Sequence, residues 1–397
     1  MSMKSNVVIL GATGSIGLST LDVIQRNQAR YSIFALAAGS NVESMQKLCV
    51  THQPKYAVMH CEAAAKQLKE ALKHTHIEVL SGTQAMCDLA SHSDVDTVMS
   101  AIVGAAGLLP TLAAVEAGKK VLLANKESLV MSGQLFMDKV AKYGATLLPI
   151  DSEHNAIYQC LPHTLQQNTD LGLDSQGINK ILLTGSGGPF LTRDLKTLPH
   201  VTVKEAVAHP NWSMGQKISV DSATMMNKGL EFIEAKWLFN CAVDDIEVVI
   251  HPQSMIHSMV QYKDGSVIAQ MGQPDMRTPI AYGLAYPDRI NAGVAPLDFS
   301  TIANFTFSKP DFTRYPNLAL AIEACRSGQA ATTTINAANE MSVAAFLANK
   351  IGFCDIYRIN SEVLAKSTLN SLNSVQAIME QDAQARAIAR QCISELN

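Results

Sequence analysis

Residues 7–17 read VVILGATGSIG, an apolar run followed by three spaced glycines and the first residues of a helical pattern. The glycine spacing is G-x-x-G-x-x-G, a variant of the fingerprint of dinucleotide-binding turns. Glycine allows the turn to tighten and the backbone to approach a pyrophosphate, which then lies at the positive end of the following helix. A tight strand–helix turn that binds nothing is the alternative, and the motif alone leaves both interpretations open.

Outward from this turn, short β-rich runs alternate with helical patterns as far as residue 150. We expect strands at 6–10, 32–37, 56–59, 97–101, 121–124 and 145–150. We expect helices at 16–25, 42–49, 63–72 and 129–143. Alternation with crossovers of this length predicts an α/β fold whose amino-terminal domain, residues 1–150, is a Rossmann-like doubly wound parallel sheet.

The pattern changes after residue 150. Residues 151–286 mix strand signals at 247–251 and 266–271 with a helical stretch at 222–239, which predicts a central α+β domain. Residues 287–316 are irregular and punctuated by proline, and we interpret them as a linker. Beyond the linker, residues 317–397 carry apolar side chains at helical spacing in 317–326, 331–349 and 375–396, so an α-helical domain closes the chain.

Composition excludes several classes of partner. The net charge of −4 comes without a basic patch or an acidic tail, which argues against nucleic acid and membrane surfaces as partners. The eight cysteines include no C-x-x-C pair, so neither a zinc knuckle nor a disulfide framework is predicted. No apolar run approaches the ~20 residues that span a bilayer, and residues 1–4 lead into the first strand without a signal segment. We therefore expect a cytoplasmic location.

The second expected strand ends at Gly39, Ser40 and Asn41, with no carboxylate for a ribose 2′-hydroxyl. This favours NADP over NAD, since a carboxylate there would repel a 2′-phosphate. Ser40 and Asn41 are possible donors to that phosphate, although the tripeptide holds no Arg or Lys. The segment 125–127, Asn-Lys-Glu, follows a later strand, where ligands of open α/β sheets bind; a solvated helix start is the alternative.

Two carboxylates, a hydroxyl and an imidazole follow the strand expected at 145–150, in the order Asp151, Ser152, Glu153, His154. In an extended segment Asp151 and Glu153 point the same way, and hard carboxylate oxygens suit Mg²⁺ or Mn²⁺. Glu231 is the best candidate for a third ligand. The alternatives are that Asp151 or Ser152 caps a helix at 155–161, and that Glu231 pairs on a helix surface with Lys228, three residues before it.

Side chains of the types that can bind a phosphate are grouped in the segment 221–231, DSATMMNKGLE. Ser222, Asn227 and Lys228 are the donor types that a phosphate needs, and Ser186 lies in the glycine-rich segment 184–189. The segment 209–215, HPNWSMG, has the composition of a loop that closes over a ligand, although an ordinary surface loop anchored by its tryptophan fits equally well. We expect His251 and His257 to be structural.

Taken in order, these segments resemble the 1-deoxy-D-xylulose 5-phosphate reductoisomerase family over essentially the whole chain. The motifs that carry the resemblance are GATGSIG, LLANKESLV, PIDSEHNAI, LLTGSGGPF, HPNWSMG, ISVDSATMMNKGLE and QPDMRTPIAYG. Members are homodimers that use NADPH and a divalent metal ion, and the resemblance implies a central domain with catalytic and dimerisation roles. It also implies rearrangement of a sugar phosphate, 1-deoxy-D-xylulose 5-phosphate, and reduction to 2-C-methyl-D-erythritol 4-phosphate in isoprenoid biosynthesis.

The resemblance implies a role for each matching residue. The cofactor contacts would be Thr13, Gly14, Ser15 and Ile16 at the pyrophosphate, Gly39, Ser40 and Asn41 near the adenosine phosphate, Asn125 and Glu127, and Gly215 and Met276 near the nicotinamide. The metal ligands would be Asp151, Glu153 and Glu231. Substrate would be bound by Lys126, Ser152, Glu153, Ser186, His209, Trp212, Ser222, Asn227, Lys228 and Glu231, of which Lys126, Glu153, His209 and Glu231 are the catalytic candidates. Many relatives carry Lys or Arg in place of Ser40, which puts the strength of the preference for NADPH over NADH in question.

Two other functions are compatible with parts of the pattern. An oxidative decarboxylase of a hydroxy acid would use the same ion and cofactor, but it needs an Arg cluster for its extra carboxylates, and Arg193 is the only Arg between Asp151 and Glu231. A non-catalytic sugar-phosphate sensor would have little use for three carboxylates that converge on a metal.

Overall fold

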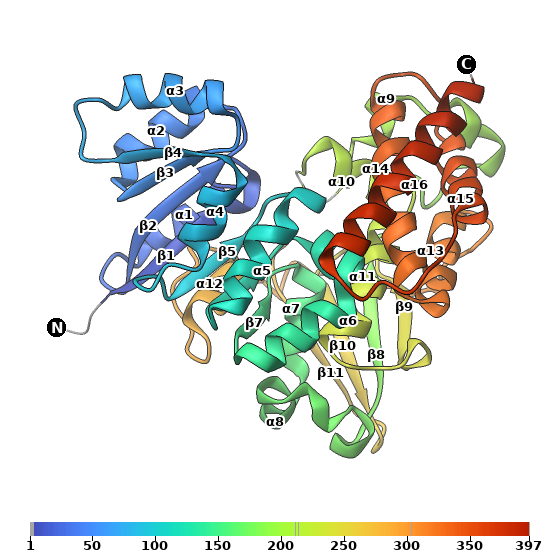
Figure 1. Ribbon diagram of the computed structural model, residues 1–397. Helices are drawn as coiled ribbons and strands as arrows, with labels where there is room; N and C mark the ends of the chain where they lie inside the picture. Colours follow the sequence, from blue (N-terminus) through green and yellow to red (C-terminus); the bar gives the residue numbers. More distant parts are fainter. Residues whose placement is uncertain (1–3, 211, 213, 303, 397) are drawn as a thin grey trace. The chain divides into compact units, whose positions relative to one another are not determined.

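The computed structural model describes residues 4–210, 212, 214–302 and 304–396, which form two compact units. Unit 1 comprises Met1–Ser128, Phe136–Asn155 and Asp275–Pro296. Unit 2 comprises Leu129–Leu135, Ala156–Pro274 and Leu297–Asn397. Each unit is built on its own sheet (Figure 1).

Unit 1 contains a seven-stranded sheet in the order β4-β3-β2-β1-β5-β6-β7, in which every pair of neighbours is parallel. The strands are β1 (Ser5–Leu10), β2 (Tyr31–Ala38), β3 (Tyr56–Met59), β4 (Glu78–Ser81), β5 (Thr97–Ser100), β6 (Lys120–Leu123) and β7 (Thr146–Pro149). The prediction of a doubly wound parallel sheet is therefore confirmed. Strand β4 was not predicted, because its four residues lie at the sheet edge and include only two apolar side chains.

The chain reverses the direction of winding between β1 and β5, and ligands of open α/β sheets bind at such a switch point. Gly11 follows β1 with φ +88°, a left-handed conformation that favours glycine. A Cβ atom at this position would lie 2.5 Å from the carbonyl oxygen of Ala101, just beyond β5. The turn after β1 therefore requires glycine both for its backbone conformation and for its close approach to the neighbouring strand.

The sheet of unit 1 is accompanied by helices from distant parts of the sequence. Their bounds are α1 (Ser15–Arg26), α2 (Val42–His52), α3 (Glu62–Ala71), α4 (Gly82–Ala90), α5 (Leu108–Glu116), α6 (Lys126–Tyr143) and α12 (Arg277–Ala285). Residues Leu129–Leu135 of α6 belong to unit 2. Helix α12 packs on α1, and the Arg277 guanidinium group forms ion pairs with Asp275 and, at 3.0 Å, with Asp22 of α1. Helices α4 and α5 were not predicted.

Unit 2 contains a four-stranded sheet in the order β11-β10-β8-β9. Its strands are β8 (Ile178–Gly185), β9 (Ile246–Ile250), β10 (Ile256–Tyr262) and β11 (Val267–Met271). Strand β10 is antiparallel to both β8 and β11, whereas β8 and β9 are parallel. The prediction found β9 and β11 but not the two central strands, which are the ones that position the site.

The helical stretch predicted at 222–239 is two helices, α10 (Gln216–Ala223) and α11 (Met226–Leu238), so that prediction is wrong. Met225 lies between them with φ +59°. A left-handed residue interrupts the helical ladder and changes the direction of the chain. The motif 221–231 therefore forms an elbow between two helices, which we call the α10–α11 elbow.

The carboxyl-terminal part of unit 2 is helical (orange to red in Figure 1). Its helices are α13 (Pro316–Ser327), α14 (Gln329–Leu347), α15 (Asp355–Lys366) and α16 (Val375–Glu395). The remaining α-helices of the described residues are α7 (Ser152–Cys160), α8 (His163–Gln167) and α9 (Val203–Ala206). Helix α14 lies at the centre and contacts α13, α15 and α16. Three of these four helices match the prediction, whereas α15 was missed. In the part of the chain that the structure describes, no helix is long and apolar enough to cross a membrane.

Candidate active site

The turn after β1 in unit 1 presents the amino-terminal end of α1. Gly14 is the N-cap, and because glycine has no side chain, the first backbone N–H groups of the helix are not capped by one. Gly14 and Ser15 are exposed, and Thr13 and Ile16 are half-buried. The first turn, SIGL, contains no acidic residue. This end of the helix is therefore suited to bind an anionic group, as a dinucleotide pyrophosphate requires.

The end of β2 lies beside that turn, since the N–H groups of Gly11 and Ala12 both donate to the carbonyl oxygen of Ala37. The predicted adenosine-phosphate residues Gly39, Ser40 and Asn41 follow β2 and are exposed. The side chain of Asn41 caps α2 by accepting a hydrogen bond from Ser44 N–H at 3.0 Å. Ser40 thus offers an exposed hydroxyl at a position where a carboxylate would repel a 2′-phosphate.

The loop after β6 brings a second group of predicted residues to the same sheet edge. Asn125 is the N-cap of α6: its Oδ1 accepts hydrogen bonds from the N–H and hydroxyl groups of Ser128, both at 2.7 Å. Its Nδ2 donates to the carbonyl oxygens of Ile102 and Gly104 beyond β5. The Asn125 side chain therefore fixes the loop, while Glu127 is buried in the first turn of α6.

Lys126 and Asp151 form an ion pair in unit 1. They follow β6 and β7, which are neighbouring parallel strands, so their positions at one sheet edge come from the topology. The side chains are only 9% and 16% exposed. Because a charged group is costly to remove from water, a nearly buried pair of this kind marks a candidate functional site.

The segment 151–154 is not extended, so the geometry argued for it from the sequence is wrong. Helix α7 begins at Ser152, and Asn155 N–H donates to the Asp151 carbonyl oxygen at 2.9 Å. Glu153 lies in the first turn, where the helix dipole favours a negative charge, and accepts a hydrogen bond from the Ser152 hydroxyl at 2.5 Å. The helix also starts three residues earlier than the capping alternative assumed.

In unit 2, the glycine-rich segment 184–189 leaves the end of β8 and contacts the α10–α11 elbow. Ser186 Oγ lies 3.0 Å from His209 Nε2 and accepts a hydrogen bond from Gly188 N–H, also at 3.0 Å. Gly188 has φ +67°, and a Cβ atom there would lie 2.6 Å from the carbonyl oxygen of Ser222. Glycine therefore allows Ser186 and Ser222 to lie in adjoining segments.

Helix α11 begins with the remaining predicted phosphate ligands. Lys228 and Glu231 form an ion pair, and Asn227 Nδ2 donates to the Glu231 carboxylate. One alternative raised from the sequence was that Glu231 pairs with Lys228 on a helix surface. The pairing is confirmed, but the surface location is wrong, because Lys228 and Glu231 are only 3% and 0% exposed. A buried lysine and carboxylate on one helix turn are again a marker of a functional site.

The loop 209–215 contains two of the predicted substrate contacts. Trp212 N–H donates to His209 Nδ1 at 3.0 Å, and Gly215 is the N-cap of α10. The Trp212 ring also contacts His257 of β10, with centroids 6.1 Å apart. This contact is compatible with the structural role expected of His257, although nothing in the sequence around His257 predicts the contact. Asn211 and Ser213 of the same loop lie outside the described residues.

The structure brings the predicted residues together in two groups, one in each unit. Unit 1 holds the turn at 13–16 and the segments 39–41, 125–127 and 151–153, with Met276 at the N-cap of α12. Unit 2 holds Ser186, His209, Trp212, the α10–α11 elbow and Glu231. His251 is structural as predicted: its Nδ1 donates to the Thr306 carbonyl oxygen and its Nε2 accepts from Ile256 N–H.

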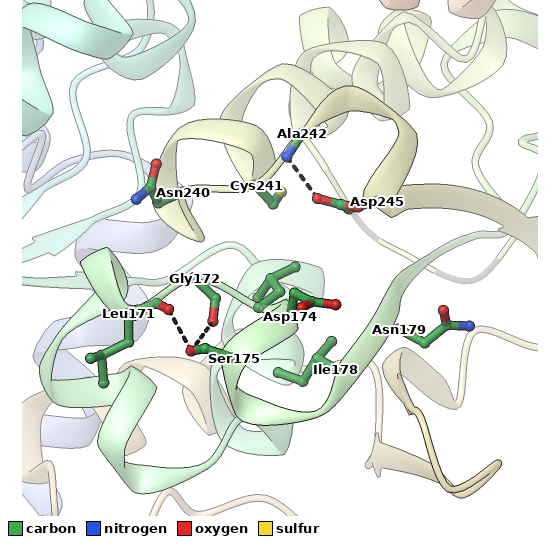
Figure 2. Close-up of a pocket in the computed structure, with 11 residues that line it drawn as sticks. Leu171, Gly172, Asp174, Ser175, Ile178, Asn179, Asn240, Cys241, Ala242 and Asp245 are labelled. Carbon is green, nitrogen blue, oxygen red and sulfur yellow. Dashed lines mark hydrogen bonds between the residues drawn. The ribbon is translucent and has the colours of Figure 1, made fainter.

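A cavity of about 560 Å³ in unit 2 is separate from these residues (Figure 2). It is lined by Leu171, Gly172, Leu173, Asp174, Ser175, Ile178, Asn179, Asn240, Cys241, Ala242 and Asp245. Some of its polar groups bond one another: the Ser175 hydroxyl donates to the carbonyl oxygens of Leu171 and Gly172, and Ala242 N–H donates to Asp245. None of the predicted metal, phosphate or cofactor residues lines it, so we do not assign it to the active site.

Comparison with protein-family models matches three consecutive parts of the chain. Residues 7–133 match the 1-deoxy-D-xylulose 5-phosphate reductoisomerase model. Residues 147–239 and 271–388 match two carboxyl-terminal domain models of the same enzyme. The three matches leave out only short connecting segments and the two ends.

Whole-chain relatives agree with these matches. The chain is 62% identical to 1-deoxy-D-xylulose 5-phosphate reductoisomerase of Shewanella amazonensis and 59% identical to that of Aliivibrio salmonicida, covering 98% of this chain and 100% and 99% of the relatives. Among solved structures, a DOX-P reductoisomerase in complex with NADPH, fosmidomycin and magnesium has a TM-score of 0.96 at 48% identity, covering 99% of each chain. A reductoisomerase from Zymomonas mobilis in complex with NADPH has a TM-score of 0.90 at 46% identity, covering 98% of this chain and 99% of that one.

Proposed function

The chain belongs to the 1-deoxy-D-xylulose 5-phosphate reductoisomerase family, and on that premise we propose that the two groups of residues described above are its active site. The enzyme converts 1-deoxy-D-xylulose 5-phosphate to 2-C-methyl-D-erythritol 4-phosphate with NADPH and a divalent metal ion, a reaction of isoprenoid biosynthesis. The assignment of residues rests mainly on the buried ion pair between Lys228 and Glu231 on α11. Charged side chains are rarely buried in a protein core unless they have a functional role.

Asp151, Glu153 and Glu231 are the proposed metal ligands. Their donor atoms are carboxylate oxygens, which fit Mg²⁺ or Mn²⁺, and complete burial of Glu231 gives it a strong need for positive charge. When bound, the ion supplies Lewis-acid polarisation of substrate oxygens and a template for their orientation. Lys126, paired with Asp151, holds a positive charge at the same sheet edge, where it stabilises negative charge that develops on the substrate.

The cofactor is proposed to bind at the carboxyl edge of the sheet in unit 1. Thr13, Gly14, Ser15 and Ile16 form the turn proposed to face its pyrophosphate, where no side chain caps the start of α1, and Ser40 and Asn41 are proposed to contact its adenosine phosphate. Bound NADPH supplies the hydride for the reduction. Asn125 and Glu127 in unit 1, Met276 at the start of α12, and Gly215 in unit 2 complete the proposed contacts.

The substrate phosphate is proposed to bind in unit 2, between the glycine-rich segment and the α10–α11 elbow. Ser186, Ser222, Asn227 and Lys228 supply hydroxyl, amide and ammonium donors there. The loop with His209 and Trp212 is proposed to close over the substrate and exclude water, and Ser152 to donate to a substrate oxygen. Binding energy from a phosphate remote from the reacting carbons can drive such closure, so its loss should lower turnover as well as affinity.

Following NADPH absorbance with 1-deoxy-D-xylulose 5-phosphate tests the function directly. We expect NADPH oxidation that requires Mg²⁺ or Mn²⁺ and stops when a chelator removes the ion. With NADH we expect a lower rate, and the ratio of the two rates measures how well Ser40 and Asn41 discriminate without an Arg or Lys. An absence of oxidation by folded, metal-loaded protein would mean that this member has been turned to another substrate or to sensing.

We also propose that the chain forms a homodimer through strand β11. This strand is an edge of the unit 2 sheet, and Val267 and Ile268 on it are 47% and 48% exposed. An edge strand with exposed apolar side chains is a template for pairing with another chain, here a second copy. The cytoplasmic location and the domain division at residues 150, 286 and 316 stay predictions.

Substitution of Ile268 by Lys should shift the protein from dimer to monomer in analytical ultracentrifugation. The matched control is Val50→Lys, a change on α2 at a side chain that is 55% exposed. A dimer that persists in Ile268→Lys at low micromolar concentration would place the interface elsewhere.

A further inference from the structure

A connected group of buried polar side chains joins the α10–α11 elbow to the carboxyl-terminal helices. It consists of Asp221 on α10, Asn317 on α13, Asn339 and Ser342 on α14, and Asn360 on α15, all at most 3% exposed. We call it the asparagine relay. We propose that the relay is a positioning device for the reaction: it holds the end of α10 so that the substrate phosphate finds its ligands in place. This inference rests on the phosphate site proposed above.

The bonds of the relay run without interruption from Asp221 to α13. Asn339 Nδ2 donates to Asp221 Oδ1 at 2.7 Å, and Asn339 Oδ1 accepts from Asn360 Nδ2 at 3.2 Å. Asn360 Nδ2 also donates to Asn317 Oδ1 at 3.0 Å, and its Oδ1 accepts from the Ser342 hydroxyl at 2.9 Å. Four helices from two distant parts of the sequence thus meet through side-chain hydrogen bonds.

The direction of these bonds is determined by Asp221. A carboxylate only accepts hydrogen bonds, so the amide of Asn339 must turn its NH₂ group towards Asp221 and its oxygen towards Asn360. That orientation in turn requires Asn360 to present its own NH₂ group. The second carboxylate oxygen of Asp221 pairs with Lys217 Nζ at 2.9 Å, one turn earlier on α10. A fully bonded network in a low-dielectric core specifies one arrangement, because any reversed amide leaves unbonded groups.

The phosphate site begins at the residue after Asp221. The carbonyl group of Ser222 lies against Gly188, at 2.6 Å from where a Cβ atom would be, so a shift of α10 also displaces the glycine-rich segment. The same segment is tied to the start of α13 by the hydroxyl of Tyr315, which donates to the Gly187 carbonyl oxygen at 2.8 Å. Both sides of the proposed phosphate site are therefore attached to the carboxyl-terminal helices.

Burial of a polar group is a poor way to increase stability, which argues that the relay has another use. Replacing buried ion pairs by apolar residues is often neutral or stabilising, but the replacement loses the directional constraint that the polar groups impose. Around the relay the carboxyl-terminal part has ordinary apolar packing, with Val220 and Ala223 of α10 in contact with a cluster that includes Phe346. Apolar packing holds helices together but allows them to slide slightly past one another, whereas directional hydrogen bonds limit this sliding.

Asn339→Leu removes the link while keeping the side-chain volume. We expect inorganic phosphate, used as a competitive inhibitor, to bind about tenfold more weakly, with KM for 1-deoxy-D-xylulose 5-phosphate raised by a similar factor, the size of effect that supporting residues of a site usually have. KM for NADPH should change less than about twofold, since all of its proposed contacts except Gly215 lie in unit 1. The control is Gln381→Leu, which removes another hydrogen bond of a buried side-chain amide in the same helical part, from Gln381 to the Thr334 hydroxyl.

The double variant Asp221→Asn/Asn339→Asp supplies a second test that does not depend on tolerance of leucine. In this variant the residue at 221 becomes the donor and the residue at 339 the acceptor, and residue 339 can still accept from Asn360. Each single variant should bind inorganic phosphate more weakly, whereas the inhibition constant of the double variant should return to within about threefold of the original. Lys228→Ala is assayed alongside. If Lys228→Ala weakens phosphate inhibition but Asn339→Leu does not, or if Gln381→Leu weakens it equally, the relay only stabilises the fold. If Lys228→Ala has no effect, the phosphate site itself is misplaced and the relay proposal fails with it.

Discussion

Replacing Glu231 by Gln is expected to lower kcat/KM for 1-deoxy-D-xylulose 5-phosphate by about 10³-fold or more, the effect of losing one preorganised charged group in a water-excluded site. Glutamine keeps the shape of the side chain and one oxygen acceptor for Lys228 and Asn227, but it removes the anionic ligand. Steady-state rates at saturating Mg²⁺ measure the loss. Because the change removes affinity for the ion, the ion concentration that gives half-maximal activity should rise in any activity that survives.

Glu231→Gln also removes half of a buried ion pair, so its fold has to be checked separately. Glu340→Gln is the matched control, because Glu340 forms a 2.5 Å ion pair with Arg386 elsewhere in unit 2, with side chains 17% and 22% exposed. Both variants should lose thermal stability, and only Glu231→Gln should lose turnover. Full activity of Glu231→Gln at saturating Mg²⁺ would contradict the assignment of Glu231 as a metal ligand.

Lys228→Ala is expected to raise KM for the substrate and to lower kcat, reducing kcat/KM by about 10²-fold. Charge-assisted hydrogen bonds are worth about 1.5–3 kcal/mol each, and the phosphate binding that they supply is proposed to drive closure of the loop at 209–215. Inhibition by inorganic phosphate should weaken in parallel. KM for NADPH should change little, since all of the proposed cofactor contacts except Gly215 belong to unit 1.

The lysine stem is itself packed, so loss of volume must be separated from loss of charge. Lys228 Cε lies 2.8 Å from where a Cβ atom of Gly185 would be, which leaves little free space beside it. Lys228→Met keeps the aliphatic stem and should be nearly as impaired as Lys228→Ala if the ammonium group is what matters. Lys366→Met removes a lysine of an exposed pair with Glu362 and should be neutral. Unchanged kinetic constants in Lys228→Ala would show that Lys228 has only a structural role.

Periodicity along the chain was enough to predict the sheet of unit 1. Six of its strands are apolar runs that alternate with helical patterns, and a parallel sheet with helical crossovers is the arrangement that such alternation allows. The turn at 11–17 could also be predicted, because Gly11 is favoured by its left-handed conformation and Gly17 by its close approach to Gly11 and Ala12 within the same segment. Strand β4 and helix α4 were missed because they are short, and helix α5 was missed because it is apolar nearly all round.

Motif composition identified the candidate residues of the site but not their geometry. Asp151 and Glu153 were argued to be ligands from an extended segment, whereas Glu153 lies on the first turn of α7. The helix predicted at 222–239 is interrupted at Met225, a residue with no sequence signal for a left-handed conformation. Such a conformation is imposed by tertiary contacts, which override the local preference of the residue.

The chemical identity of the site residues is local information, which is why the sequence motifs were sufficient to show the resemblance to the family and to indicate a candidate cofactor turn. Burial is not local. Lys228 and Glu231 have the spacing of an ordinary surface ion pair, and only the packing of α11 in unit 2 makes them a buried pair with functional use. The asparagine relay likewise joins Asp221 to residues more than 90 positions away, and no periodicity links them. Long-range packing decides which polar groups are removed from water, and those groups must then form hydrogen bonds or ion pairs with one another.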